Sequence, residues 1–531
     1  MELTAFVGPW VPELIVLAAG LLVLLLDVLG VRASEVGGGI AAAGSALALL
    51  FVTADLGWAP LAALRTLPGG RLDVVAASTT SLFGFTSLGL VFQAVFLIAT
   101  VLVALAAASR PRDDRGAPIF FGLLLFATLG MLLVAVAADL IFLLLAIEVT
   151  SISTYVMVGY TRRDVRSLEA AMKFYIIGAL SSTLSFFGAS FLFGAFGTTN
   201  LYAIRAILRA GPFGFPVLAL LGFGFVIAGL AFKTTLVPFH AWAVDVYDGA
   251  PSEVSAYLAG ASKKLGVLAF FLVFVGPILY LGPGSSNLFS GGPVDLGGIL
   301  AITFGVLAVA TMTFGNVLAL LQKEMKRMLA YSSISQAGYL FLGIAIGTAP
   351  AFAGATLQVF AHVFMKTGAF LVVAAAASIG VGPLIDDWRG VGARRPWFSV
   401  AFALMLLSLA GVPLTVGFVS KFVLFSAAVQ AQGLYVWLAV AGLLNSALSL
   451  FYYGRVLKVI FFDPAPATEP IPAGAVVGGS GPAPLPWGGL GYGRGAAIAV
   501  AAVAIVALGV YPQPVLGAIQ SAASHFLLAG A

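Results

Sequence analysis

Long apolar segments dominate this chain, and each is long enough to cross a lipid bilayer as a helix. Such a helix needs about 20 mainly apolar residues. Hydrophobic residues make up 61% of the 531 residues and charged residues 9%, a balance that excludes an ordinary soluble domain. We therefore predict fourteen transmembrane spans. They lie at about 9–30, 36–55, 83–108, 118–137, 139–160, 170–196, 217–240, 252–281, 297–320, 326–348, 351–380, 397–430, 435–461 and 493–520.

These segments predict an all-α membrane protein that forms one polytopic domain, residues 1–531. Within it we expect three N-terminal helices, a first repeat, a second repeat, a loop, and a last helix with the C-terminus. Proline, glycine and alanine dominate the loop, which is typical of a mobile segment. Glu2 and the lack of basic residues at the start argue against a cleaved signal peptide. The five parts are 1–108, 118–281, 297–461, 462–492 and 493–531.

Basic residues are distributed unequally between the two sets of loops. Loops that follow odd-numbered spans, with the adjoining helix ends, hold sixteen, and loops that follow even-numbered spans hold four. The positive-inside rule places the sixteen, and the mobile loop, in the cytoplasm. Both termini then lie on the non-cytoplasmic side of the cell (inner) membrane, and the net charge of +5 reflects topology, not nucleic-acid binding. The sixteen are Arg32, Arg110, Arg112, Arg115, Arg162, Arg163, Arg166, Lys323, Lys326, Arg327, Arg389, Arg394, Arg395, Arg455, Lys458 and Arg494; the four are Arg65, Arg71, Arg205 and Arg209.

Two lysines stand inside apolar spans close to prolines. Lys233 follows the apolar run 217–232 and precedes Pro238, and Lys421 follows Pro413. An ammonium group at the bilayer centre costs about 2.5–3.5 kcal/mol, and a proline interrupts the helix beside it. Transporters build ion-binding points from charges on broken helices. We therefore predict that spans seven and twelve are broken, and their offset of five spans makes them run in opposite directions.

Span five carries a buried carboxylate, and span eight carries two adjacent lysines. We expect Glu148 to pair with Lys233, because pairing keeps both groups charged and separation would change both pKa values. A static ion pair that only fixes helix packing is the alternative. Lys263 and Lys264 point about 100° apart on a helix. We therefore expect at most one to face an interior path, while the other snorkels or faces a neighbouring helix.

His362 and Lys366 lie one helical turn apart in span eleven, so they share a helix face. A histidine titrates near neutrality, and we predict that protons pass between the two through water; a packed, hydrogen-bonding histidine is the alternative. The serines and tyrosines of 329–340 would supply a hydrogen-bonded path or only pack helices, and the sequence favours neither. No cysteine is present, which excludes disulfides and thiolate-bound metals.

With these residues in view, the chain resembles the antiporter-like membrane subunits of respiratory complex I, the NADH-quinone oxidoreductase. The resemblance covers about residues 70–460 and is strongest to their subunit N branch. The segment FKTTLVPFHAWAVDVYDGAP is similar to the family's seventh-span signature, except at Val244, where proline is usual. SKKLG, KRMLAYSSISQAGYL and LSLAGVPLTVGFVSKF resemble its eighth, tenth and twelfth spans. Lys421 disfavours subunit M, which has glutamate there, whereas His362 with Lys366 looks more like subunits L and M.

The resemblance implies two inverted five-helix repeats, about spans four to eight and nine to thirteen, and a role in proton translocation. It implies no flavin, iron–sulfur cluster or metal in this chain; NAD, FMN, iron–sulfur clusters and quinone would belong to partner subunits. Expected partners are the lipid bilayer and other membrane subunits, especially subunit M and the small subunit K. In the implied relay, the carboxylate modulates the first lysine, and the last lysine communicates with the far side or the next subunit. The implied relay residues are Glu148, Lys233, Lys263, His362, Lys366 and Lys421.

Three other functions fit parts of the pattern. A subunit of a multisubunit Na⁺/H⁺ antiporter would use the same lysine series without redox partners. A self-sufficient solute permease would need a polar pocket of substrate size. A structural scaffold with an inactive relay would tolerate alanine at every interior lysine.

Overall fold

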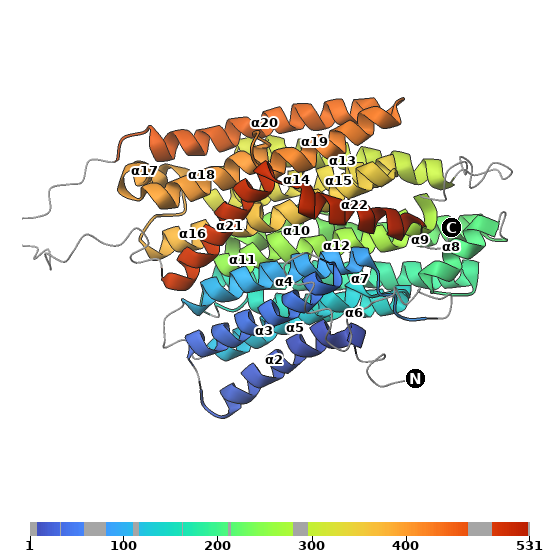
Figure 1. Ribbon diagram of the computed structural model, residues 1–531, viewed down its shortest axis with the longest axis horizontal. Helices are drawn as coiled ribbons and strands as arrows, with labels where there is room; N and C mark the ends of the chain where they lie inside the picture. Colours follow the sequence, from blue (N-terminus) through green and yellow to red (C-terminus); the bar gives the residue numbers. More distant parts are fainter. Residues whose placement is uncertain are drawn as a thin grey trace, which may run out of the picture.

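The structure is a computed structural model that describes residues 8–31, 33–57, 81–109, 116–161, 163–210, 214–279, 296–465 and 491–528. Most of these residues are helical, and no β-strand occurs among them beyond three isolated bridges between loops. Figure 1 shows most of the long helices running along one common direction, with the start of the first long helix and the end of the last helix at the same end of the bundle. Much of the loop predicted at 462–492, and seven of the predicted loop arginines, lie outside the described residues.

The N-terminal part of the chain forms six long helices before the first break. Their apolar residues are spread around each helix, as expected where neighbours or lipid surround every side. The first two helices pack on α4 and α5, and α7 packs along α9. The helices are α2 (Val11–Val28), α3 (Ser34–Asp55), α4 (Ser87–Ala108), α5 (Ala117–Ala135), α6 (Leu140–Val158) and α7 (Val165–Phe196).

The later part contains more interrupted helices, several of them shorter than those of the first part. The helix α13 packs extensively on α14, and α15 packs on α19. These helices are α13 (Leu296–Leu320), α14 (Met325–Ile346), α15 (Ala349–His362), α16 (Gly368–Ser378), α18 (Pro396–Ala410), α19 (Val416–Ala431) and α20 (Tyr435–Phe461). Shorter helices, η1 (Gly8–Trp10), η6 (Ile385–Trp388) and α17 (Val391–Arg394), lie at helix ends.

The prediction of fourteen spans is confirmed. In the described residues, thirteen helical segments are long and apolar enough to cross a membrane, and two shorter apolar helices, α18 and α19, together make the remaining span. The chain is therefore an all-α, multi-pass membrane protein.

Span seven is broken, as predicted. The helix α9 (Pro216–Thr234) ends where Thr235 adopts a left-handed conformation with φ of 61°, and α10 (Ala241–Gly249) begins after Pro238. The break frees carbonyl groups at the end of α9, and the Trp242 indole donates a hydrogen bond to Phe232 O at 3.2 Å. Such replacement partners are required where a helix is interrupted at membrane depth.

Span twelve is broken in the same manner. The helix α18 ends at Ala410 and is followed by Gly411, whose φ of 92° is in the left-handed region that favours glycine. Pro413 lies in the break, and α19 starts at Val416. In Figure 1, α9 and α18 approach the middle of the bundle from opposite ends, so the two broken spans run in opposite directions.

Spans eight and eleven contain wide helical turns beside their charged residues. Span eight consists of α11 (Ser252–Tyr257), the π-helical turn η3 (Leu258–Ser262), α12 (Lys263–Phe270) and the π-helical segment η4 (Phe271–Leu279). In span eleven, the π-helical turn η5 (Val363–Thr367) separates α15 from α16. Such turns are rare and often occur at functional sites.

Two elements differ from the sequence prediction. The last span, predicted to end at 520, is divided into α21 (Tyr492–Val510) and α22 (Gln513–Leu528), because Pro512 and Pro514 interrupt it. The short helix α8 (Leu201–Ala210) was not predicted, since ten residues are too few to span a bilayer. Arg205 of α8 donates a hydrogen bond to Leu527 O at 2.6 Å and so connects α8 to the end of α22.

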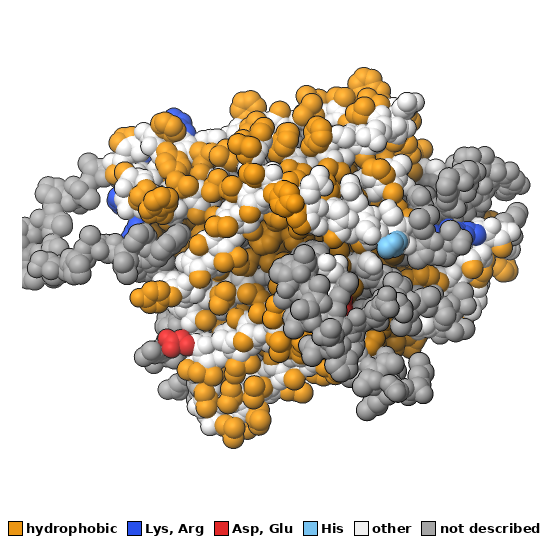
Figure 2. Space-filling model, in the orientation of Figure 1, with side chains coloured by type: hydrophobic (Ala, Val, Ile, Leu, Met, Phe, Trp, Pro, Cys, Tyr) orange, Lys and Arg blue, Asp and Glu red, His pale blue; other side chains and the backbone are white. Residues whose placement is uncertain are grey.

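The surface has the character of a membrane protein. Figure 2 shows apolar side chains over the middle of the visible face and charged side chains near its two ends. The outward face of α20 illustrates this, because Trp437, Leu443 and Phe451 are 62–70% exposed. Large apolar side chains exposed in such number require a lipid or protein neighbour.

Candidate proton-relay site

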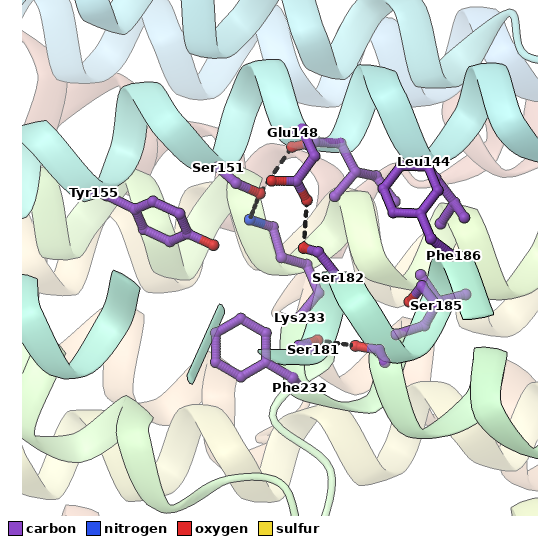
Figure 3. Close-up of a pocket in the computed structure, with 13 residues that line it drawn as sticks. Leu144, Glu148, Ser151, Tyr155, Ser181, Ser182, Ser185, Phe186, Phe232 and Lys233 are labelled. Atoms are coloured by element: carbon purple, nitrogen blue, oxygen red, sulfur yellow. Dashed lines mark hydrogen bonds between the residues drawn. The ribbon is translucent and has the colours of Figure 1, made fainter. Parts of the chain in front are cut away.

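The first cluster of the site lies where α6, α7 and α9 meet. Lys233, at the end of α9, donates a hydrogen bond to Ser151 Oγ of α6 at 2.9 Å. Ser182 of α7 donates one to Glu148 Oε1 at 2.5 Å. Figure 3 shows the ammonium and the carboxylate directed into the same space. The sequence prediction that these two spans bring Glu148 and Lys233 together agrees with this geometry.

The two groups share a cavity but do not form a direct ion pair. Glu148, Lys233 and the two serines line a cavity of about 20 Å³, which is room for one water molecule. Lys233 is 5% exposed, whereas Glu148 is partly exposed at the edge of the bundle. The expected pairing is therefore indirect in this structure, through hydroxyl groups and the space for one water.

Both lysines of span eight are buried, at 2% and 1% exposure. Lys263 donates to Ser333 Oγ of α14 at 2.9 Å and lies 5.4 Å from the centre of the Tyr247 ring. Lys264 lies 2.7 Å from His362 Nδ1. Of the two alternatives to facing an interior path, the structure shows contact with a neighbouring helix and not snorkelling, because polar partners lie on α14 and on α15.

His362 and Lys366 are both fully buried, yet they bind different partners. Lys366 donates to Leu329 O at 3.1 Å and to Ser332 Oγ, both on α14. His362 contacts Lys264 through Nδ1 and two glutamines through Nε2. No direct hydrogen bond joins these two described residues, so an exchange between them would need an intermediate.

Two glutamines extend the polar path from His362 toward the second broken span. His362 Nε2 lies 3.3 Å from Gln336 Oε1, which also accepts a hydrogen bond from Gln358 Nε2 at 3.1 Å. Gln336 Nε2 donates to Leu409 O at 3.0 Å. Ser420 donates to the other oxygen of the pair, Gln358 Oε1. All of these side chains are buried inside the bundle.

Lys421 forms the other end of the site. Its ammonium donates to Leu409 O at 2.9 Å and to Ala410 O at 3.3 Å, the carbonyls left free by the break after α18. It also lies 4.6 Å from the centre of the Tyr339 ring, in a cation–π contact. Lys421 borders an apolar groove of about 620 Å³ between α19 and α20.

Small residues bring these elements into close contact. A Cβ atom on Gly266 of α12 would lie 2.6 Å from Thr234 Cγ2 and 3.2 Å from the Lys233 backbone carbon. The helix with Lys263 and Lys264 therefore packs directly on the end of α9. No hydrogen bond joins Lys233 to either of them, so in the described chain the group around Glu148 and Lys233 is separate from the series that runs from Lys264 to Lys421.

Sequence reasoning identified the charged residues and missed four polar partners. Ser151 and Ser182 are ordinary serines in apolar helices, and their partners become visible only when α6, α7 and α9 are packed. Gln358 precedes His362 by one helical turn, a spacing that offered a usable signal. Gln336 lies in 329–340, where the sequence left a polar path and simple packing equally open.

The structure offers no arrangement suited to a resident metal. In the part of the chain that the structure describes, no three His, Asp or Glu side chains are grouped for metal binding. The chain also lacks cysteine.

Residues 137–449 match the model of the NADH:quinone oxidoreductase/Mrp antiporter transmembrane family. This range holds both broken spans and every predicted relay residue. The chain belongs to this family.

Known members confirm the resemblance to subunit N. The chain is 39% identical over 466 residues to F(420)H(2) dehydrogenase subunit N of Methanosarcina mazei, covering 85% of this chain and 88% of that protein. It is 34% identical over 491 residues to NADH-quinone oxidoreductase subunit N 2 of Sorangium cellulosum, covering 90% and 93%. A chain of respiratory complex I from Thermus thermophilus superposes with a TM-score of 0.72 at 27% identity, covering 95% and 98%.

Proposed function

We propose that this chain is a proton-translocating membrane subunit of an NADH-quinone oxidoreductase, in which redox chemistry in partner subunits drives protons along the buried lysines. The observation that carries the proposal is the buried polar series from Lys264 through His362 and Gln336 to Lys421. It lies among apolar helices, where an ammonium group costs free energy. Several lysines at this depth therefore indicate a function. Few described carboxylates approach these lysines, so neutral and charged forms are both accessible, as proton transfer requires.

The relay begins at the carboxylate and ends at the second broken span. Glu148 modulates Lys233 through their shared cavity, because a change in charge on one alters the electrostatic energy of the other. The protons then pass by Lys263 or Lys264 and by His362 and Lys366. Lys421 takes the proton at the break of span twelve, where freed carbonyls hold its ammonium form.

We propose that neighbouring membrane subunits complete both ends of this relay. Glu148 is partly exposed at the outer edge of α6, and Lys421 borders the groove between α19 and α20. A carboxylate at membrane depth is unfavourable against lipid. Going by the sequence resemblance, subunit M and the small subunit K are the expected neighbours, and the flavin, iron–sulfur clusters, NAD and quinone belong to other subunits.

Purification of the intact complex tests the proposed function. The chain should copurify with flavin and iron–sulfur subunits. The interior of membrane vesicles that carry the complex should acidify when NADH is added. A complex without redox subunits that exchanges Na⁺ for H⁺ would contradict the proposal. That result would support the cation antiporter, which the family also includes.

A further inference from the structure

The hydrogen-bonded path that connects His362 with the surroundings of Lys421 contains two amide side chains, Gln336 and Gln358, and no titratable group. Gln336 Oε1 lies 3.3 Å from His362 Nε2, and Gln336 Nε2 donates to Leu409 O at 3.0 Å. Lys421 donates to the same carbonyl oxygen at 2.9 Å. Gln336 therefore touches both the histidine and the group that holds the terminal lysine.

When Lys264 is protonated, the hydrogen bonds determine which nitrogen of His362 carries the proton. A protonated lysine only donates, so Lys264, 2.7 Å away, makes His362 Nδ1 the acceptor. The ring proton of neutral His362 then lies on Nε2 and donates to Gln336 Oε1. Gln336 is held in this orientation at its other end, because its amide nitrogen must donate to a backbone carbonyl.

We propose that Gln336 is a positioning residue that gates proton transfer between His362 and Lys421. This inference rests on the proposed function and adds the element that controls its last step. The proton on Lys264 Nζ moves to His362 Nδ1, which leaves a neutral amine and an imidazolium. The Nε2 proton is the one that moves on to a neutral Lys421, and the ring becomes neutral again.

Gln336 prevents this last step while it covers Nε2. An amide oxygen is too weak a base to keep the proton, and the amide separates the ring from the lysine. Lys421 and Gln336 share the Leu409 carbonyl, so a change in the charge of Lys421 changes the hydrogen bond that anchors Gln336. The gate thereby responds to the protonation state of the group that it supplies.

Gln358 supports the gate from the other side. It donates to Gln336 Oε1 at 3.1 Å, and Ser420 donates to Gln358 Oε1. Ser420 is the residue before Lys421, so movement of α19 reaches the amide pair through two routes. Lys366 and Lys263 make no hydrogen bond to this amide pair in the described chain, because they bind serines of α14.

The test compares Gln336→Met and Gln336→Leu with wild type in membrane vesicles, using NADH as donor and a short-chain ubiquinone as acceptor. Both variants remove the three hydrogen bonds of the Gln336 amide and replace it with an apolar side chain of similar size. Without the gate, protons return from Lys421 to His362 as readily as they move forward, so we expect roughly a tenfold fall in protons pumped per electron, with complex assembly and electron transfer within about twofold of wild type. Ser335→Ala is the matched control, because the buried Ser335 hydroxyl has no hydrogen-bond partner.

Three results would overturn the inference. One is an unchanged ratio of protons to electrons in both variants, and another is a proportional fall in pumping and electron transfer, which a structural role predicts. The third is failure of both variants to assemble while Ser335→Ala assembles. If wild type itself shows no NADH-driven pumping, the proposed function fails instead, which separates the two claims.

Discussion

At the residue scale, the site depends on which polar atom each buried charge meets. Lys263 and Lys264 are adjacent and equally buried, yet only Lys264 contacts His362, at 2.7 Å. Lys263 contacts Ser333, a hydroxyl that can pass a proton but is not a base near neutrality. The resemblance to the family assigned the relay to Lys263, and the geometry gives Lys264 the direct contact.

Lys264→Met tests this difference. Methionine has a similar length without charge, so we expect the complex to assemble and proton pumping to fall by roughly tenfold or more. Pumping by vesicles, relative to electron transfer, is the measurement. Lys458→Met is the control, because Lys458 is an exposed residue whose pairing with Asp463 at 3.7 Å contributes little. Wild-type pumping by Lys264→Met would remove this lysine from the relay.

At the scale of elements, the site exists because helices break and approach closely. The two breaks leave backbone carbonyls free, and those of α18 hold Lys421. Gly266 brings α12 onto the end of α9, next to Lys233. The relative placement of these charged residues therefore depends on contacts that allow no additional atom.

Gly266→Ala should destabilise this packing. Its Cβ would lie 2.6 Å from Thr234 Cγ2, and relief of such overpacking costs about 1–3 kcal/mol. We expect a lower Tm for the purified complex, measured by thermal unfolding of this subunit. Gly224→Ala in α9 is the matched control, since a Cβ there meets no atom within 4 Å. Equal Tm values for the two variants would contradict the packing argument.

At the scale of the whole molecule, the two ends of the polar series lie on opposite sides of the bundle. Figure 1 shows α6 and α7 in the lower half of the bundle and α19 and α20 at its upper side. Glu148 is partly exposed on the first side, and Lys421 borders a groove of about 620 Å³ on the second. Among the described residues, Glu148 is partly exposed and the groove beside Lys421 is open, which supports membrane neighbours at both places.

Cysteine labelling tests the second of these contacts. The chain has no cysteine, so Leu443→Cys in the groove supplies a single thiol. We expect N-ethylmaleimide to label it in the isolated chain and much more slowly in the assembled complex. Val503→Cys on α21 has a similar exposure, 67% against 62%, and should be labelled in both. Equal labelling of Leu443→Cys in both preparations would contradict a neighbour at this groove.

The sequence was sufficient for the main architecture and for the charged residues. The length and hydropathy of each segment predict the spans. Lys233 and Lys421 can be recognised because each is a charge in an apolar segment near a proline. Hydrogen-bond partners such as Gln336 and Leu409 O depend on how helices far apart in sequence pack, which periodicity does not specify. Pro512 and Pro514 in the sequence indicate a break in the last span. The continuation of the chain as α22 beyond residue 520 depends on packing against α4 and α15, which the sequence does not specify.

The most direct test of the central claim is NADH-driven proton pumping in vesicles that carry wild type or Lys233→Ala, with assembly verified by copurification. The buried-lysine relay predicts an assembled complex in which Lys233→Ala loses proton pumping. Normal pumping by an assembled Lys233→Ala complex would contradict it, because the first lysine of the relay would then be dispensable.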